Sequence, residues 1–211
     1  MLWRADLPRS PRCTPDGRLK DRRHMHPDVS IIPLNGKTPR IHESAFIAPG
    51  CRIIGDVEIG PDVSIWYNCV LRGDVNFIRI GARTNIQDGS VIHVDSPAPG
   101  KPEGFPTIIG EDVLVGHLAM VHGCVIEDRG FVGLGAIVMS GAHIESDGML
   151  AAGAMLTGGK RIGARQLWGG RPATYMRDLT EPALVEMQRG VQHYVRNGQA
   201  HKAAVLGASE G

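Results

Sequence analysis

Aromatic side chains are scarce in this chain of 211 residues. They make up 5% of it, whereas glycine occurs 28 times. Most globular cores rely on Phe, Tyr and Trp, because each buries a large area. The scarcity therefore argues against an aromatic core and favours a core of small aliphatic positions repeated along the chain.

Long apolar runs, a charge excess and paired cysteine motifs are also missing. No apolar run approaches the roughly 18 residues of a membrane-spanning helix. The 23 basic residues nearly cancel the 22 acidic ones, so no global field favours nucleic acid or anionic lipid. Four cysteines without a C-x-x-C motif are typical of reduced thiols. We therefore predict a cytoplasmic protein without a nucleic-acid or membrane partner.

The first residues differ in composition from the rest. Residues 1–24 hold seven Arg or Lys, three Asp and three Pro, with little apolar periodicity. Such a composition is typical of disorder. We predict that residues 1–28 are a disordered leader, or a mis-started one with translation beginning at Met25.

A six-residue period runs through the middle of the chain. It is interrupted by a three-residue insertion after Leu71, by the stretch VDSPAPGKPEGFP at 94–106, and by a slip of one residue after Val121. The aliphatic residues in phase are Ile41, Ile47, Ile53, Ile59, Ile65, Leu71, Ile80, Ile86, Ile92, Ile109, Val115, Val121, Ile126, Val132, Val138, Ile144, Leu150, Leu156 and Ile162, and Trp168 closes the series.

This period fits neither a helix nor an alternating strand. Six residues make one side of a triangular coil, as a short strand plus a turn, and 18 residues make one turn of the coil. The aliphatic residue points inward, and we expect glycine to supply the corners. The prediction is a mainly β protein, with a left-handed parallel β-helix over residues 29–178.

After this repeat the sequence predicts a helix. Thr180 can cap it, and Glu181 with Pro182 suits its first turn. An apolar stripe follows on one helical face: Leu184, Met187, Val191, Tyr194 and Val195. We assign residues 179–206 to a C-terminal helical unit packed on the prism, with Asn197 and Gly198 as a plausible stop.

Three histidines flank the break in the repeat. His93 and His122 each come one position after an inward aliphatic residue, whereas His117 comes two positions after one. Five residues of nearly extended chain span roughly 16 Å, but a zinc ion needs nitrogens at about 2.0–2.1 Å. One chain would struggle to bring all three to one point. Two neighbouring prisms could, which predicts a metal at a subunit interface of a homotrimer.

A histidine pair five residues apart is weak evidence alone, because most such pairs bind no metal. The residues upstream strengthen it, namely Arg72, Asp74, Asn85, Gln87 and Asp88. Long polar residues on a β-helix face normally point to solvent. A dense group beside histidines instead suggests hydrogen bonds that orient ligands and a bound water.

The stretches RGDVNFIRIGARTNIQDGSVIH and VGHLAMVHGC resemble the γ-class carbonic anhydrases and their bacterial relatives, over about residues 30–200. The resemblance implies a trimeric left-handed β-helix with a C-terminal helix. It also implies one Zn²⁺, Fe²⁺ or Co²⁺ per subunit interface, bound by His93 and His122 of one chain and by His117 of the next.

The same resemblance implies further roles. Arg72 and Asp74 match the interface ion pair of the family. Gln87 and Asp88 match residues that contact or position the metal-bound solvent, and Tyr194 in HYVRN matches a C-terminal tyrosine near the site more loosely. The implied reaction is the reversible hydration of CO2 to bicarbonate by a metal hydroxide, which makes the protein a carbonate dehydratase.

The chain departs from the family prototype where protons would be exported. Val75 stands where the prototype has a glutamate, and the loop after the first histidine is short, with only Asp95 and Glu103. Many relatives with this pattern show little or no CO2 hydration. The resemblance therefore implies a competent metal site with slow CO2 chemistry.

Three rival functions remain open at this stage. A hexapeptide-repeat acyltransferase shares the prism and often carries the sequence GGRPA, found here near the exit from the repeat. An acyl-CoA thioesterase is a related possibility. The third is a non-catalytic metal-binding assembly trimer.

Overall fold

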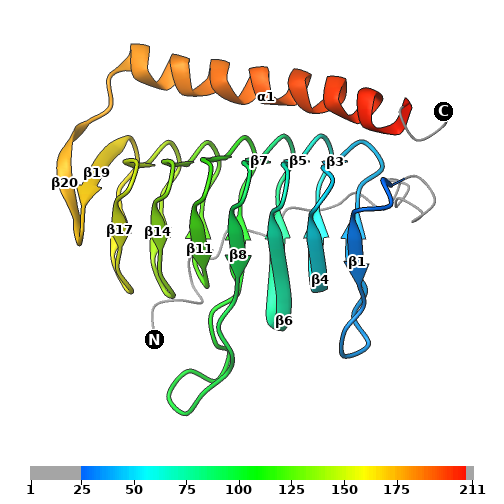
Figure 1. Ribbon diagram of the computed structural model, residues 1–211. Coiled ribbons are helices and arrows are strands. Elements are labelled where there is room, and N and C mark those ends of the chain that lie inside the picture. The colour runs from blue at the N-terminus through cyan, green and yellow to red at the C-terminus, as the bar shows by residue number, and fades with distance from the viewer. Residues whose placement is uncertain (1–24, 208–211) are drawn as a thin grey trace.

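The protein is a parallel β-helix with one long helix along its side, described by a computed structural model over residues 25–207 (Figure 1). Most of the predicted leader lies outside this range, as does Cys13. Within the described range no helix combines the length and the apolar character that crossing a bilayer requires.

Three faces of short strands make up the prism. The first face contains β1 (Ser30–Ile32), β4 (Arg52–Ile59), β6 (Val70–Ile80), β8 (Val91–His93), β11 (Met120–His122), β14 (Ile137–Val138) and β17 (Met155–Leu156). The second contains β2 (Arg40–Ile41), β9 (Thr107–Ile109), β12 (Val125–Ile126), β15 (His143–Ile144) and β18 (Arg161–Ile162), together with the ends of β4 and β6.

The third face is the one that carries the helix. It contains β3 (Phe46–Ile47), β5 (Ser64–Ile65), β7 (Asn85–Ile86), β10 (Leu114–Val115), β13 (Phe131–Val132), β16 (Met149–Leu150) and β19 (Gln166–Gly170). Each strand pairs in parallel with its copy in the neighbouring turn of the coil. The antiparallel strand β20 (Ala173–Asp178) ends the coil.

The predicted aliphatic column forms the core. Ile53, Ile86, Ile126 and Leu150 are each 0% exposed, and Trp168, the last member, is only partly buried. Stacking identical positions from successive turns removes apolar surface from water without large rings. The six-residue period therefore predicted this fold correctly.

The expectation that glycine supplies the corners is only partly right. Gly50, Gly89 and Gly135 do adopt positive φ at corners of the coil. However, another corner uses charged residues in the same left-handed conformation, among them Arg129 (φ 60°) and Asp147 (φ 62°). These two side chains form a paired-N–H ion pair across successive turns of the coil, which offsets part of the conformational cost.

Helix α1 (Glu181–Gly207) runs back along the third face from the β20 end toward β3 (Figure 1). Met187 and Val191 of the predicted stripe are buried. The predicted stop at Gly198 is wrong, because the helix continues for nine more residues. A Cβ on Gly198 would lie 3.1 Å from the Ser64 Cβ. Glycine serves here to bring the helix close to the prism.

Candidate metal centre

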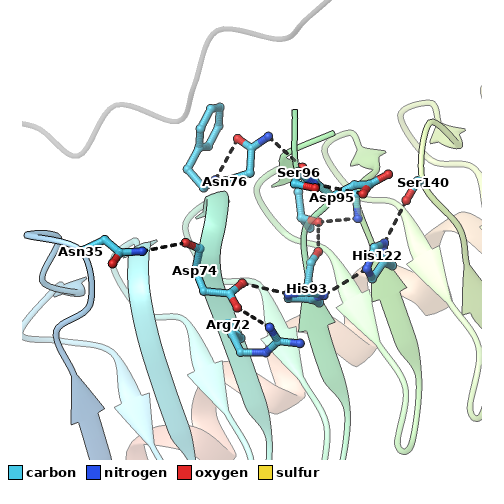
Figure 2. A network of polar contacts seen from close by, with 12 residues as sticks. Asn35, Arg72, Asp74, Asn76, His93, Asp95, Ser96, His122 and Ser140 are labelled. Carbon is cyan, nitrogen blue, oxygen red and sulfur yellow. Dashed lines mark hydrogen bonds and ion pairs between the residues drawn. The ribbon is translucent and has the colours of Figure 1, made fainter. Parts of the chain in front are cut away.

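Two of the three predicted metal ligands face each other on the first face of the prism. Strands β8 and β11 pair in parallel with His93 opposite His122. His93 Nδ1 lies 3.0 Å from His122 Nε2 (Figure 2). Two nitrogens bound to one tetrahedral ion at about 2.0–2.1 Å lie about 3.3 Å apart, so the observed spacing is close to that of a shared ion.

The outer nitrogen of each of these rings also has a partner. Asp74 Oδ1 lies 2.9 Å from His93 Nε2, and Ser140 Oγ lies 2.9 Å from His122 Nδ1 (Figure 2). A carboxylate only accepts, so His93 carries its proton on Nε2 and presents the Nδ1 lone pair to His122. The His93–Asp74 pair is typical of a metal-binding histidine, which donates its second N–H to a supporting group. In this state His122 Nε2 donates to His93, so His122 Nδ1 accepts from the Ser140 hydroxyl.

Electrostatics favours an ionised Asp74 and a neutral His122, which are the charge states that suit a bound cation. Burial opposes ionisation of Asp74, but hydrogen bonds from His93 and Arg72 outweigh it and hold the pKa of that carboxyl below its usual range. Burial, followed by the charge of His93, lowers the pKa of His122. A metal ligand must be a neutral imidazole, so a lowered pKa favours binding. Arg72, predicted as one half of an interface pair with Asp74, contacts Asp74 within this chain.

His117 lies apart from this pair, in the turn between β10 and β11. Its Nδ1 is 2.8 Å from Asp88 Oδ2, and its side chain is 41% exposed, against 17% for His93. The Asp88 carboxylate fixes the proton on Nδ1, which leaves the His117 Nε2 lone pair free. Across residues 25–207, no three His, Cys, Asp or Glu side chains form a group that could hold a metal.

Gln87 and Asn85 support His117 from beneath helix α1. The Gln87 side-chain oxygen accepts from the His117 backbone N–H at 3.2 Å, and Gln87 Nε2 donates to Asn85 Oδ1. Both residues are buried, and Asn85 Nδ2 is a buried donor that lacks a partner among the described residues. Such an orphan donor indicates a place for a water or a small polar molecule.

Tyr194 reaches this region from α1. Its ring packs edge-on against Trp66, with centroids 5.5 Å apart. Burial, followed by the charge of Asp88, raises the pKa of its hydroxyl, so the group stays a neutral donor at physiological pH.

Sequence reasoning did not identify Ser140, and it named Asn85 only as a member of the polar group beside the histidines, without a role of its own. Ser140 lies 18 residues beyond His122, but β11 and β14 pair with an offset of 17 residues, so Ser140 comes one position after the residue in register with His122 and the repeat alone does not identify it. Asn85 belongs to the polar group upstream of the histidines, but its burial follows from the helix lying over it, which the local sequence does not show.

The fold defines the class of protein. A model described as bacterial transferase hexapeptide (six repeats) matches residues 38–73. A solved structure from Bacillus cereus, described as a candidate acetyltransferase, is 39% identical with a TM-score of 0.78, covering 84% of this chain and 99% of its own. The protein is thus a left-handed β-helix of hexapeptide repeats.

Two curated relatives narrow this class. The mitochondrial gamma carbonic anhydrase 1 of Arabidopsis thaliana is 42% identical over 192 residues, which is 90% of this chain and 69% of that protein. A carbonic anhydrase of Geobacillus kaustophilus is 43% identical over 173 residues, which is 82% of this chain and 91% of that one. The chain belongs to the gamma carbonic anhydrase family.

Proposed function

We propose that this protein is a metal-dependent carbonic anhydrase that interconverts CO2 and bicarbonate. The observation that carries the proposal is the division of the histidines. His93 and His122 face each other at ligand spacing, whereas His117 presents a free nitrogen elsewhere on the surface. The two relatives that are named carbonic anhydrases support this reaction.

The donor set fits a divalent ion such as Zn²⁺, with Fe²⁺ or Co²⁺ as alternatives, because imidazole suits these borderline ions. His93 and His122 would hold it from one chain and His117 from the next. When bound, such an ion supplies Lewis acidity that brings the pKa of a water to about 7; the general example behind that value is carbonic anhydrase itself.

The remaining side chains have supporting roles in this proposal. Asp74 and Ser140 orient the paired rings, and Asp88 orients His117. Gln87 holds the His117 backbone, and the buried amide of Asn85 offers a donor to a substrate oxygen. Tyr194 adds a neutral hydroxyl from α1.

A homotrimer would complete the site, and the surface beside His117 suits burial. Leu118, the next residue, is 73% exposed, and Leu134 in the neighbouring turn is 52% exposed. Exposed aliphatic side chains beside an incomplete polar site are typical of subunit interfaces. One ion per interface follows from this arrangement.

Mixed trimers of His117→Ala and His93→Ala subunits test the shared site. Neither subunit has all three ligands, but an interface has them when the His117→Ala subunit supplies His93 and His122 and the His93→Ala subunit supplies His117. At equal random mixing about one interface in four should regain a full set, so metal analysis should find metal that is absent from either pure trimer. Mixed trimers without metal would show that the site is not shared.

Stopped-flow CO2 hydration on metal-loaded, reduced protein tests the reaction. We expect a slow rate, because Val75 and the short loop after β8 provide no glutamate in the prototype's proton-export positions. A rate no higher than that of the free metal would remove the carbonic anhydrase assignment, even if the metal binds tightly.

An acyl-CoA transferase or thioesterase is the second candidate. The similar Bacillus cereus structure, described as a candidate acetyltransferase, favours it. Coenzyme A should then raise the unfolding temperature, because a ligand that binds only the native state stabilises it.

The three described cysteines are free and buried, which supports a reducing, cytoplasmic compartment.

A further inference from the structure

A groove separates the first part of α1 from the corner of the prism that carries Arg129, Asp147 and Arg165. Its volume is about 570 Å³, within the usual range for small-molecule sites of about 300–1,000 Å³. The charged residues that line it are Arg129, Asp147, Arg165, Glu181, Arg189 and Arg196. Four guanidinium groups against two carboxylates give the groove a positive excess.

On the prism side, the arginines are partly engaged. Arg129 uses Nε and Nη2 on the Asp147 carboxylate, at 2.8 and 2.9 Å, and Arg165 uses Nη2 on Glu181. Each therefore keeps N–H groups for another acceptor. Both residues hold left-handed backbone conformations (φ 60° and 59°) at a corner of the coil. The coil therefore fixes the positions of their Cα and Cβ atoms.

On the helix side, the arginine side chains are exposed and have almost no partners among the described residues. Arg189 and Arg196 are seven residues apart and so lie on one face of α1, with Gln188 and Gln192 beside them. Arg189 has one weak contact, 3.4 Å to Glu186. Arg196 is exposed and has no hydrogen-bond or ion-pair partner within residues 25–207. By contrast, Lys202 on the same helix is bound to backbone oxygens of its own prism.

We propose that this groove binds a phosphorylated small molecule. Guanidinium groups match phosphate oxygens with paired N–H donors, and groups from two sides of a cleft can hold one dianion between them. Leu184 and Val185 add an apolar wall, which suits the organic part of the ligand. The site is independent of the proposed CO2 chemistry.

Calorimetric titration of the full chain with pyrophosphate and with ATP, in the presence of chelator, tests the groove. We expect saturable binding of both, weakened at least tenfold in Arg189→Gln and Arg196→Gln. Lys160→Gln removes an exposed charge from a turn outside the groove and should bind as the wild type does. All three substitutions are on exposed side chains, and unchanged unfolding temperatures would confirm that the variants fold.

Inorganic phosphate separates the two sources of the anion. Tighter binding of ATP than of phosphate would point to an organic phosphate, whereas equal affinities would overturn the organic ligand and leave an anion site. No saturable binding at millimolar concentrations, or an equal loss in Lys160→Gln, would overturn the proposal. Metal content in His117→Ala reports separately on the metal site.

Discussion

At the residue scale, the candidate centre depends on pairs in which a small polar group orients each histidine. Asp88 holds His117, Asp74 holds His93, and Ser140 holds His122. The two carboxylates can only accept, so they fix which nitrogen of His117 and His93 carries a proton and which one presents a lone pair, whereas the Ser140 hydroxyl can donate or accept. The chemistry of the site is thus decided as much by the supporting groups as by the ligands.

Asp88→Asn should weaken metal binding without unfolding the protein. The amide cannot supply the negative charge that fixes the His117 proton on Nδ1, and losses of such supporting groups typically cost about 10–100-fold in metal affinity. Chelator competition would measure the change. Asp112→Asn, which removes a carboxylate paired with Arg83 at another corner, should leave the affinity unaltered. Equal affinities in wild type and Asp88→Asn would contradict the role.

Glu145→Gln should reduce the sensitivity of the fold to acid. The hydrogen bond from Arg161 holds the pKa of the Glu145 carboxyl below its ordinary value. A depressed folded pKa contributes stability above the unfolded value, and this is lost as pH falls through the folded one. Denaturant unfolding from pH 7 to about pH 3 should therefore show a stability gap between wild type and variant that closes toward acid.

The control for this acid series is Glu186→Gln, whose contact with Arg189 is long and exposed. Exposed pairs of this kind contribute about 0–1 kcal/mol, so the variant should follow the wild type closely. If the difference in unfolding free energy between the wild type and Glu145→Gln stays constant with pH, the carboxylate charge is not the source of the stability.

At the element scale, each short strand is stabilised by pairing with the strands of the neighbouring turns. The helix is stabilised by its close approach to the third face of the prism. Strands of two residues such as β5 and β7 cannot persist alone, but each pairs on both sides. Helix α1 has few buried side chains for its length, so the contact at Gly198 with Ser64 carries weight. The element that covers Asn85 and delivers Tyr194 depends on this contact.

Gly198→Leu should therefore destabilise the protein although leucine favours helices. The new side chain has no room against β5, and overpacking of this kind costs about 1–3 kcal/mol. Gly207→Leu is a matched control, because nothing lies within 4 Å of a Cβ there. Chemical denaturation would measure both. A neutral or stabilising Gly198→Leu would mean that α1 is free to move away from the prism.

At the scale of the whole molecule, the prism holds a divided site. One chain brings two of the proposed ligands, His93 and His122, together and sends the third, His117, outward. The helix lies on the third face and covers β3, β5, β7 and β10, whereas the facing histidines lie on the first. The corner between these two faces carries His117 and the exposed Leu118, and it is the surface that we propose faces a neighbouring subunit.

Metal removal should consequently weaken the assembly. An ion that binds only the assembled native state adds about 4 kcal/mol when present at 1,000 times its Kd. Chelator should lower the unfolding temperature and make the oligomer dissociate at higher protein concentration, as measured by analytical ultracentrifugation. His117→Ala protein should show no response to chelator. A chelator-stripped protein with unchanged temperature and assembly would contradict a metal between subunits.

Some features could not be read from the sequence, for identifiable reasons. The six-residue period predicted the coil because burial repeats with each turn. Gly198 was misread as a helix stop, because a glycine that ends a helix and one that lets it approach a surface look alike locally. The charged corner residues were missed because their left-handed backbone is compensated by partners a full turn away.

The sequence by itself determined the β-helix and its inward column, because both follow from residue type and spacing along one chain. The phase of the repeat already predicted that His93 and His122 share a face and that His117 does not. Only the tertiary structure decided which groups support these rings, namely Asp74, Ser140 and Asp88. It also decided that α1 buries Asn85 and leaves a groove lined by arginines. The physical reason is that spacing fixes phase within the coil, whereas side-chain partners depend on which turns and faces become neighbours.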